Sequence, residues 1–255
     1  MRNDAEIILS TEHLRKDFGG LVAVDDVSLQ VASGTLHTII GPNGAGKTTL
    51  FNLLSGRYSP SSGRILFLGH DVTHMPPNRR SHLGIGRSFQ ITNIFPNLTV
   101  LENVRIAAQS RGADSWKFWS HYRHFGQYER RAREIIAQVG LGGREALLAQ
   151  ALPHGDKRKL EIAILLATDP LLLLLDEPTA GLSRDGVPAI LEIIRALKAE
   201  PGRTILLVEH KMDMVMNLSD RITVMHLGKV IAEGTPAEVA ANGAVQAAYL
   251  GGARW

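Results

Sequence analysis

The stretch LLLLLDEPTAGL, residues 171–182, places five leucines directly before two acids and a proline. The apolar run is too short to cross a membrane, which takes about 20 apolar residues. It has the length of a strand buried on both faces, as in a parallel sheet covered by helices. Ligands of such sheets bind at the carboxyl ends of the strands, where Asp176 and Glu177 fall. The alternative is a core strand that ends in a charged turn, so the acids need a partner motif.

The partner motif lies upstream, at GPNGAGKTT, residues 41–49. An apolar strand over residues 36–40 precedes it and an apolar helix start over residues 50–54 follows, which is the context of the Walker A pattern G-x-x-x-x-G-K-[ST]. The glycines let backbone N–H groups point at phosphate oxygens, and Lys47 adds a charge for the β- and γ-phosphates. The predicted nucleotide-binding residues are Gly41, Pro42, Asn43, Gly44, Ala45, Gly46, Lys47, Thr48 and Thr49.

A phosphate loop in the same chain predicts functions for the two acids, Asp176 and Glu177. Thr48 and Asp176 would bind Mg²⁺, as the P-loop hydroxyl and the Walker B aspartate do. Glu177 would be the general base that orients the attacking water. The leucines before the acids would keep the strand rigid and dry, so that both carboxylates are held near the triphosphate. A glycine-rich turn with a purely structural role is the alternative for residues 41–49.

The composition of the chain limits its size class, its metal ligands and its partners. The chain has 255 residues, 44% hydrophobic and 21% charged, which suits one large domain or a core with a smaller subdomain. It has no cysteine, which excludes disulfides and cysteine-ligated metals and fits a cytosolic protein. Residues 1–6 lack the apolar core of a signal peptide. The formal net charge of +3 is that of a generic soluble surface, so we expect no nucleic-acid partner.

Six elements, in this order along the chain, resemble the motifs of the ATP-binding cassette (ABC) ATPase family. They are an A-loop over residues 14–18, Walker A, a Q-loop over residues 87–90, a signature segment over residues 152–156, Walker B with a D-loop at residues 180–183, and a switch histidine, His210. The resemblance implies that Phe18 stacks on adenine, that Gln90 contacts the metal and the attacking water, and that His210 acts with Glu177. Taken singly, Phe18 also fits a core aromatic, Gln90 a solvated turn and His210 a strand-end histidine.

The resemblance also implies the fold. We expect an α/β P-loop NTPase of the ABC ATPase type over residues 7–255, with a mostly parallel core sheet and an antiparallel β subdomain. A helical subdomain would be inserted at residues 91–155, where the sequence is polar and helical in pattern. Residues 27–31 alternate as a half-buried strand does.

The signature segment departs from the usual L-S-G-G-Q of the family. Leu152 and Gly155 remain, but Pro153, His154 and Asp156 replace the serine, a glycine and the glutamine. We expect a helix to open at residues 157–159, with its N-terminus available to phosphate. Signature motifs of the family act in trans, on the nucleotide of the other subunit. A heterodimer would tolerate one imperfect signature, while a homodimer is the alternative.

Longer stretches resemble the ATPases of branched-chain amino-acid importers, namely residues 84–90 with 94–104, residues 152–156 with 159–163, residues 208–213 and residues 248–251. This resemblance implies an ATP-hydrolysing importer subunit that uses ATP and Mg²⁺ at the cytoplasmic face of the membrane. Its partners would be permease subunits, a second ABC ATPase and, indirectly, an extracytoplasmic substrate-binding protein. The alternatives are the ATPase of a lipopolysaccharide or lipid exporter, and a non-transport ABC ATPase that acts on DNA or ribosomes.

One segment belongs to none of these motifs. Residues 115–128 hold six of the chain's aromatic residues, which number 3 Trp, 4 Tyr and 7 Phe in all. Basic residues lie among them. The cluster fits a small local core or a patch that docks a membrane partner, and less well a surface that stacks single-stranded nucleic acid.

Overall fold

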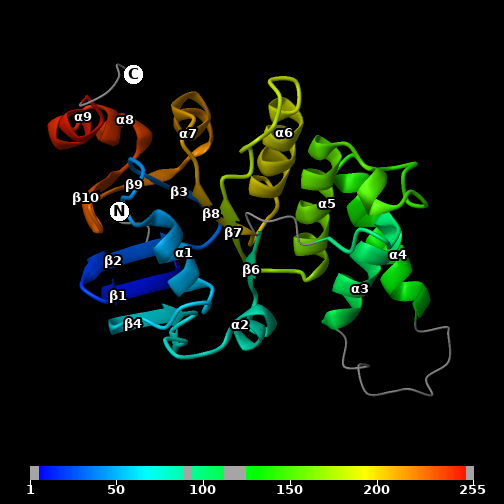
Figure 1. Ribbon diagram of the computed structural model, residues 1–255, viewed down its shortest axis with the longest axis horizontal. Coiled ribbons are helices and arrows are strands. Elements are labelled where there is room, and N and C mark those ends of the chain that lie inside the picture. The colour runs from blue at the N-terminus through cyan, green and yellow to red at the C-terminus, as the bar shows by residue number, and fades with distance from the viewer. Residues whose placement is uncertain (1–5, 89–93, 112–124, 251–255) are drawn as a thin grey trace. The chain divides into compact units, whose positions relative to one another are not determined.

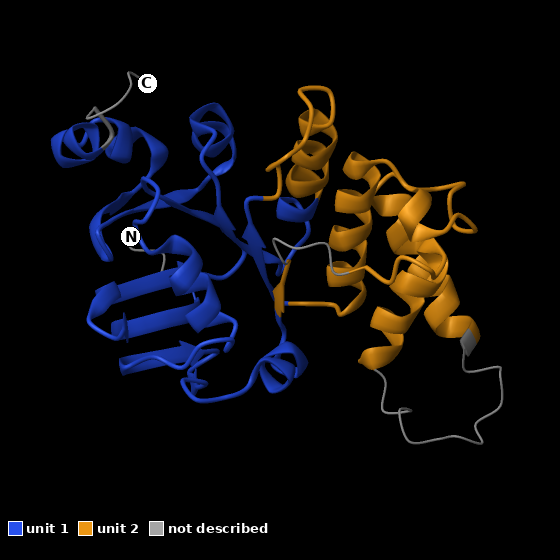
Figure 2. Ribbon diagram, in the orientation of Figure 1, with its two compact units in different colours: residues 1–85, 171–177, 197–255 blue, residues 86–170, 178–196 orange. Residues whose placement is uncertain are grey.

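The computed structural model of the protein describes residues 6–88, 94–111 and 125–250. The chain forms two compact units, which Figure 2 colours separately. Unit 1 comprises residues 1–85, 171–177 and 197–255, and unit 2 comprises residues 86–170 and 178–196. Within the described ranges, no helix is long and apolar enough to cross a membrane.

Unit 1 contains a four-stranded antiparallel sheet in the order β2-β1-β4-β5 (Figure 1). Its strands are β1 (Ile7–Phe18), β2 (Leu21–Ala32), β4 (Ser62–Phe67) and β5 (His70–Asp71). The first two strands form a hairpin that turns at Gly19 and Gly20, both with positive φ. Bulges shift the register between these strands next to His13 and Asp26, which have φ of 48° and 56°. This sheet is the antiparallel part of the predicted fold.

A second sheet of six strands has the order β10-β9-β3-β8-β7-β6. Its strands are β3 (Leu36–Ile40), β6 (Ile85–Arg87), β7 (Leu172–Asp176), β8 (Thr204–Val208), β9 (Arg221–His226) and β10 (Lys229–Gly234). The pairs β9–β3, β3–β8 and β8–β7 are parallel, whereas β10 runs antiparallel to β9. Every residue of β3, β7 and β8 is buried, as in strands covered on both faces. Four leucines of the run, Leu172–Leu175, therefore form the buried parallel strand that the sequence predicts, while Leu171 precedes the strand and is exposed.

Two apolar cores lie on opposite faces of this sheet. The larger contains Ile39 and Met225 with apolar residues of the antiparallel sheet and of α1, and the smaller contains Ile40 and Val224 with residues of α7, α8 and α9. Sequence neighbours fall into different cores because successive strand side chains point to opposite faces. The helices of unit 1 are α1 (Lys47–Leu54), α2 (Pro77–Leu83), α7 (Met212–Leu218), α8 (Pro236–Ala240) and α9 (Gly243–Leu250).

A buried cation joins α2 to the end of α1. The Arg80 guanidinium donates hydrogen bonds to the carbonyl oxygens of Leu53 and Leu54, both at 2.7 Å, and to those of Thr73 and Met75, both at 2.9 Å. Burial lowers the pKa of Arg80 to about 10, so the group stays charged at neutral pH. Its position satisfies carbonyl groups that end α1 and complements the dipole of that helix.

Unit 2 is mainly helical. It contains α3 (Val100–Ser110), α4 (Phe125–Gln138), α5 (His154–Ala167) and most of α6 (Val187–Lys198). The first of these begins at a capping box, in which the hydroxyl of Thr99 accepts from the N–H of Glu102 and the carboxylate of Glu102 accepts from the N–H of Thr99. Helix α3 packs on both α4 and α5.

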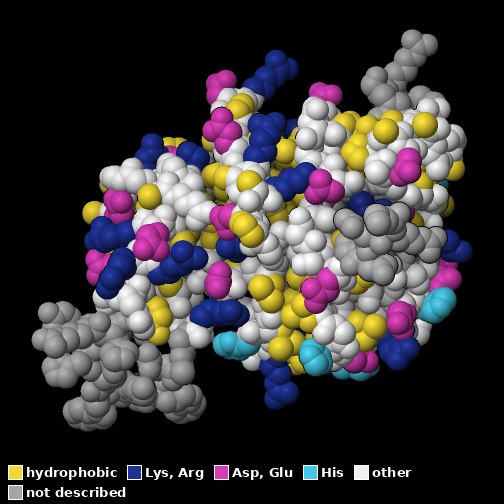
Figure 3. Space-filling view, turned by 180° about the vertical axis from the view of Figure 1, so that it is seen from behind, with side chains coloured by type: hydrophobic (Ala, Val, Ile, Leu, Met, Phe, Trp, Pro, Cys, Tyr) yellow, Lys and Arg dark blue, Asp and Glu magenta, His cyan; other side chains and the backbone are white. Residues whose placement is uncertain are grey.

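The surface carries charges of both signs. Figure 3 shows Lys and Arg side chains interspersed with Asp and Glu side chains on the face it presents. The described residues also form exposed ion pairs, such as Arg64 with Glu12 at 2.7 Å and Arg221 with Glu233 at 2.9 Å. Exposed pairs of this kind contribute little to stability, so the cores carry most of the folding free energy.

The central strand β3 contains a buried histidine that makes stability depend on pH. His37 is fully buried, and its Nε2 lies 2.7 Å from the hydroxyl of Thr223. Burial, with a smaller contribution from the Arg221 charge, lowers the pKa of His37 from 6.5 to about 4. Between these values the unfolded chain binds a proton that the folded chain excludes, so the free energy of unfolding falls as the pH falls.

We therefore expect the His37→Gln variant, which can keep a hydrogen bond to Thr223, to lose this pH dependence. Between pH 7.5 and pH 5, the parent should lose about 2 kcal/mol more of its unfolding free energy than the variant, by proton linkage. Urea denaturation of both proteins at the two pH values measures the difference. Equal losses would show that His37 does not cause the effect.

Candidate functional site

The phosphate loop, residues 41–49, leaves β3 and enters α1, and its backbone passes very close to two other strands. A Cβ atom at Gly41 would lie 2.2 Å from the carbonyl oxygen of Met225, and one at Gly46 would lie 2.2 Å from that of Ala23. Gly46 also has a φ of 98°, which residues with a Cβ rarely adopt. Only glycine fits at these two positions.

The ammonium of Lys47 lies inside this loop. Its Nζ donates hydrogen bonds to the carbonyl oxygens of Gly41 at 2.7 Å and of Pro42 at 3.0 Å, and the residue is buried. Burial lowers the pKa of Lys47, while the nearby carboxylates of Glu177 and Asp176 act in the opposite direction. The loop thus presents a cation at the N-terminus of α1, which is the arrangement that binds phosphate.

Two acids stand at the end of β7. Asp176 is fully buried, and the parallel register sets it beside Val208, the last residue of β8. The N–H of Glu177 continues this ladder by donating to the carbonyl oxygen of Val208 at 2.9 Å. With a φ of 46°, Glu177 turns the chain out of the strand in a conformation that non-glycine residues seldom adopt.

A histidine from the next strand end meets the second acid. Nε2 of His210 lies 2.6 Å from Oε1 of Glu177, and both side chains are partly exposed. The carboxylate of Glu209 is buried and accepts the N–H of His210 at 2.9 Å, which fixes the turn after β8. A carboxylate held by an imidazole in this way can accept a proton from water and keep a fixed orientation while it does so.

Residues of the phosphate loop, Glu177 and His210 line one pocket of about 320 Å³, whereas the buried Asp176 lies outside this lining. Its lining residues are Leu21, Val22, Ala23, Asn43, Gly44, Ala45, Gly46, Lys47, Thr48, Thr49, Glu177 and His210. All belong to unit 1. The structure thus brings most of the residues of the predicted phosphate loop together with the proposed base and the switch histidine. Gly41 and Pro42 lie outside the lining, and their carbonyl oxygens accept hydrogen bonds from Lys47, which is part of it.

The predicted adenine-stacking residue lies outside this lining. The ring of Phe18 is 44% exposed and packs edge-on against Tyr58, with ring centroids 5.5 Å apart. The ammonium of Lys16 lies 5.0 Å from its centroid. Residues 21–23 form the wall instead, and sequence reasoning missed them. The Gly19–Gly20 turn was a sequence signal for this wall. A hairpin at these glycines pairs Leu21 with Phe18, so the residue opposite the predicted aromatic could have been considered as well.

Two predictions fall on residues that the structure does not describe. Gln90 lies within residues 89–93, and most of the aromatic cluster lies within residues 112–124, both outside the described ranges. Both therefore stay predictions.

The signature segment, Leu152–Asp156, belongs to unit 2. Helix α5 begins at His154 with Pro153 as its N-cap, so the expected start at residues 157–159 is three residues too late. Proline, with its fixed φ and no N–H, suits a helix start. Asp156 pairs with Arg144 and, at 3.3 Å, with Lys159, so its carboxylate is neutralised within the unit.

The donor set near the loop fits Mg²⁺. Thr48 offers a hydroxyl and Asp176 a carboxylate, the hard oxygen ligands that Mg²⁺ prefers. Among the described residues, no three His, Cys, Asp or Glu side chains form a group that could hold a metal ion. Mg²⁺ commonly takes one or two protein oxygens and completes its shell with phosphates and water, which matches this sparse set.

Family models match two parts of the chain. The model described as ABC transporter matches residues 24–180, and the model described as branched-chain amino acid ATP-binding cassette transporter matches residues 229–254. The first match covers the phosphate loop, both acids and the signature segment, and the second covers β10, α8 and α9. Both agree with the order of motifs in the sequence.

Whole-chain relatives extend these matches. The high-affinity branched-chain amino acid transport ATP-binding protein LivG of Escherichia coli K12 is 39% identical over 96% of this chain and 98% of its own length. BraF of Pseudomonas aeruginosa, a protein of the same description, is 38% identical over 96% of this chain and 98% of its own length.

Solved structures agree with the fold. A nucleotide-free ATP-binding cassette from an ABC transporter superposes with a TM-score of 0.82 and 32% identity, covering 95% of this chain and 98% of its own. The ADP conformation of an ATP-binding cassette of an ABC transporter also has a TM-score of 0.82 and 32% identity, covering 96% of this chain and 99% of its own. With its phosphate loop, acid pair and histidine in this arrangement, the chain belongs to the ABC transporter family, as an ATP-binding cassette ATPase.

Proposed function

We propose that this chain is the ATP-hydrolysing subunit of an ABC importer that carries branched-chain amino acids or related small polar substrates. The observation that carries the hydrolytic role is the 2.6 Å contact between Glu177 and His210 in the pocket that the phosphate loop lines. The substrate class rests on the names of LivG and BraF and on the C-terminal family match over residues 229–254.

In the proposed reaction, the loop N–H groups and Lys47 bind the phosphates of ATP. Thr48, Asp176 and Gln90 would hold Mg²⁺, which when bound neutralises phosphate charge. Glu177 accepts a proton from water as the water oxygen attacks the γ-phosphorus. The bond from that phosphorus to the bridging oxygen breaks, and ADP and phosphate leave. His210 keeps the carboxylate in position.

The proposed partners follow from the same assignment. Two ATPase subunits would bind ATP head to tail, so that the signature segment, Leu152–Asp156, of each faces the nucleotide of the other. Within each subunit, Phe18 would stack on adenine. The helical subdomain at residues 91–155 would contact the permease at the cytoplasmic face of the membrane. A heterodimer fits the altered signature. This chain's signature would face the partner's nucleotide, so the site that combines this chain's phosphate loop with the partner's signature would be unaffected.

One prediction from this function concerns the general base. In Glu177→Gln, ATP binding should be retained, but turnover should fall by about 100-fold or more, the usual contribution of a general base. Binding is retained because the amide keeps the size of the side chain and removes only the proton acceptor. Steady-state phosphate release and calorimetric titration with ATP and Mg²⁺ measure the two quantities.

The controls separate binding from chemistry. Glu192→Gln, an exposed acid on α6, should leave both quantities unchanged, whereas Lys47→Ala should lose nucleotide affinity. Parent-like turnover in Glu177→Gln would exclude Glu177 as the base.

Another prediction from this function concerns assembly. Because the signature segment lacks its serine and glutamine, the isolated subunit should hydrolyse ATP slowly and sediment mostly as a monomer at micromolar concentration. Addition of the cognate second ATPase and the permease should raise turnover. A tight, fully active homodimer of this chain alone would contradict the heterodimer.

A further inference from the structure

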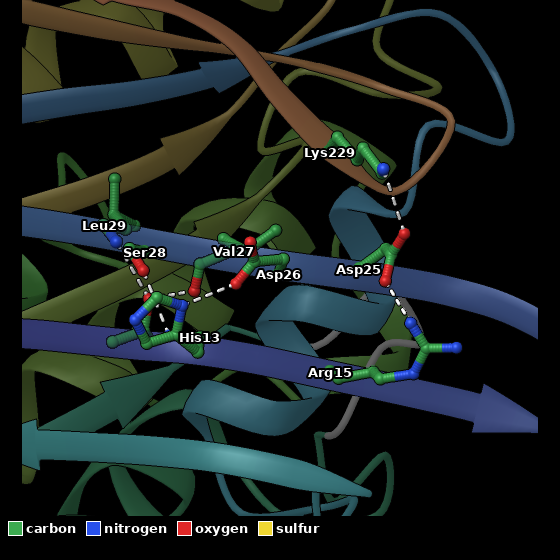
Figure 4. A network of polar contacts seen from close by, with 9 residues as sticks. His13, Arg15, Asp25, Asp26, Val27, Ser28, Leu29 and Lys229 are labelled. Atoms are coloured by element: carbon green, nitrogen blue, oxygen red, sulfur yellow. Dashed lines mark hydrogen bonds and ion pairs between the residues drawn. The ribbon is translucent and has the colours of Figure 1, made fainter.

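Asp25 in β2 joins three strands of unit 1. One carboxylate oxygen pairs with Nη1 of Arg15 in β1, and the other lies 3.3 Å from Nζ of Lys229 in β10, as Figure 4 shows. The carboxylate is 26% exposed, so it lies between the two cations rather than in open solvent. A partly buried acid with two cationic partners on different strands is suited to fix their spacing.

The backbone of Asp25 extends this link to the phosphate loop. Its N–H donates to the carbonyl oxygen of Gly228 at 2.8 Å, and the N–H of Gly228 donates to that of Ala45 at 3.1 Å. Ala45 is part of the pocket lining. The β9–β10 turn thus stands between β2 and the loop, with hydrogen bonds to both.

The pocket-lining residues that precede Asp25 in β2 are apolar. Residues 21–23 form this wall, and Leu21 pairs with Phe18 across the hairpin. Lys47 and the loop N–H groups occupy the phosphate end of the pocket, so the apolar wall is left for the nucleoside. The close approach of Ala23 to Gly46 anchors β2 at the phosphate end, so a change in how β2 is held would move the nucleoside end at Leu21 and Val22.

We propose that Asp25 is a positioning residue that sets the β1–β2 hairpin for the nucleoside of ATP. This inference rests on the proposed function. Through Arg15 and Lys229, Asp25 holds the wall at residues 21–23 at a fixed distance from the phosphate loop. The residue touches no nucleotide itself, and it acts on affinity for ATP but not on affinity for the phosphate chain alone.

The next residue provides a matched control. Asp26 lies in the same strand and pairs with Nδ1 of His13 at 2.7 Å, and both side chains are largely exposed. Neither residue lines the pocket at the phosphate loop. Its φ of 56° is one that asparagine tolerates well, so Asp26→Asn removes a charge without backbone strain.

The test compares two ligands on the full chain, ATP and inorganic tripolyphosphate, each with Mg²⁺, by calorimetric titration. Asp25→Asn should weaken ATP binding by about 5-fold, the upper range for a partly exposed ion pair, and leave tripolyphosphate binding unchanged. Lys229→Met, which removes one of the two ion pairs without altering β2, should show a smaller effect in the same direction. Asp26→Asn should match the parent for both ligands.

Unchanged ATP affinity in both Asp25→Asn and Lys229→Met would overturn the inference. An equal loss for ATP and tripolyphosphate would also overturn it, since that result indicates general damage to the loop. If Asp25→Asn fails to fold, Lys229→Met decides by the same comparison. A parent protein that binds no ATP would instead overturn the proposed function.

Discussion

The position of the phosphate loop depends on a steric constraint at two glycines. Carbonyl oxygens of β9 and β2 lie 2.2 Å from where a Cβ would stand on Gly41 and Gly46, so the loop is wedged between the backbones of two sheets. Backbone that cannot move away holds its N–H groups in place before any ligand arrives. Such preorganisation is the main contribution a protein makes to binding and stabilising phosphate charge.

The parallel register of β3, β8 and β7 brings the charged groups of the site to one edge of the sheet. Ile39 pairs with Val208, and Val208 pairs with Asp176, so β3, β8 and β7 end at the same level of the sheet. The phosphate loop, the acid pair and His210 leave from these ends. A buried ammonium and a buried carboxylate would each be costly alone, and their proximity offsets part of the desolvation of both.

Much of this could be predicted from sequence because it is encoded locally. The leucine run, the glycine spacing and the order of motifs predict the parallel sheet and its ligand edge. Features that arise from contacts between distant segments could not be predicted, namely the burial of Arg80 against the end of α1 and the neutral His37 in β3. The start of α5 was missed because Pro153 and His154 replace the residues that usually mark it, although proline itself favours a helix start.

The backbone of Glu177 shows how the sheet and the chemistry are connected. A left-handed conformation at a residue with a Cβ costs about 1–2 kcal/mol, and it persists only where neighbours fix it. Here the ladder bond to Val208 fixes the N–H, and His210 holds the side chain. Since strand side chains alternate, a regular continuation of β7 would direct consecutive residues to opposite faces. The left-handed turn instead lets Asp176 stay buried while the next carboxylate lines the pocket, so the strain permits two adjacent acids to serve one site.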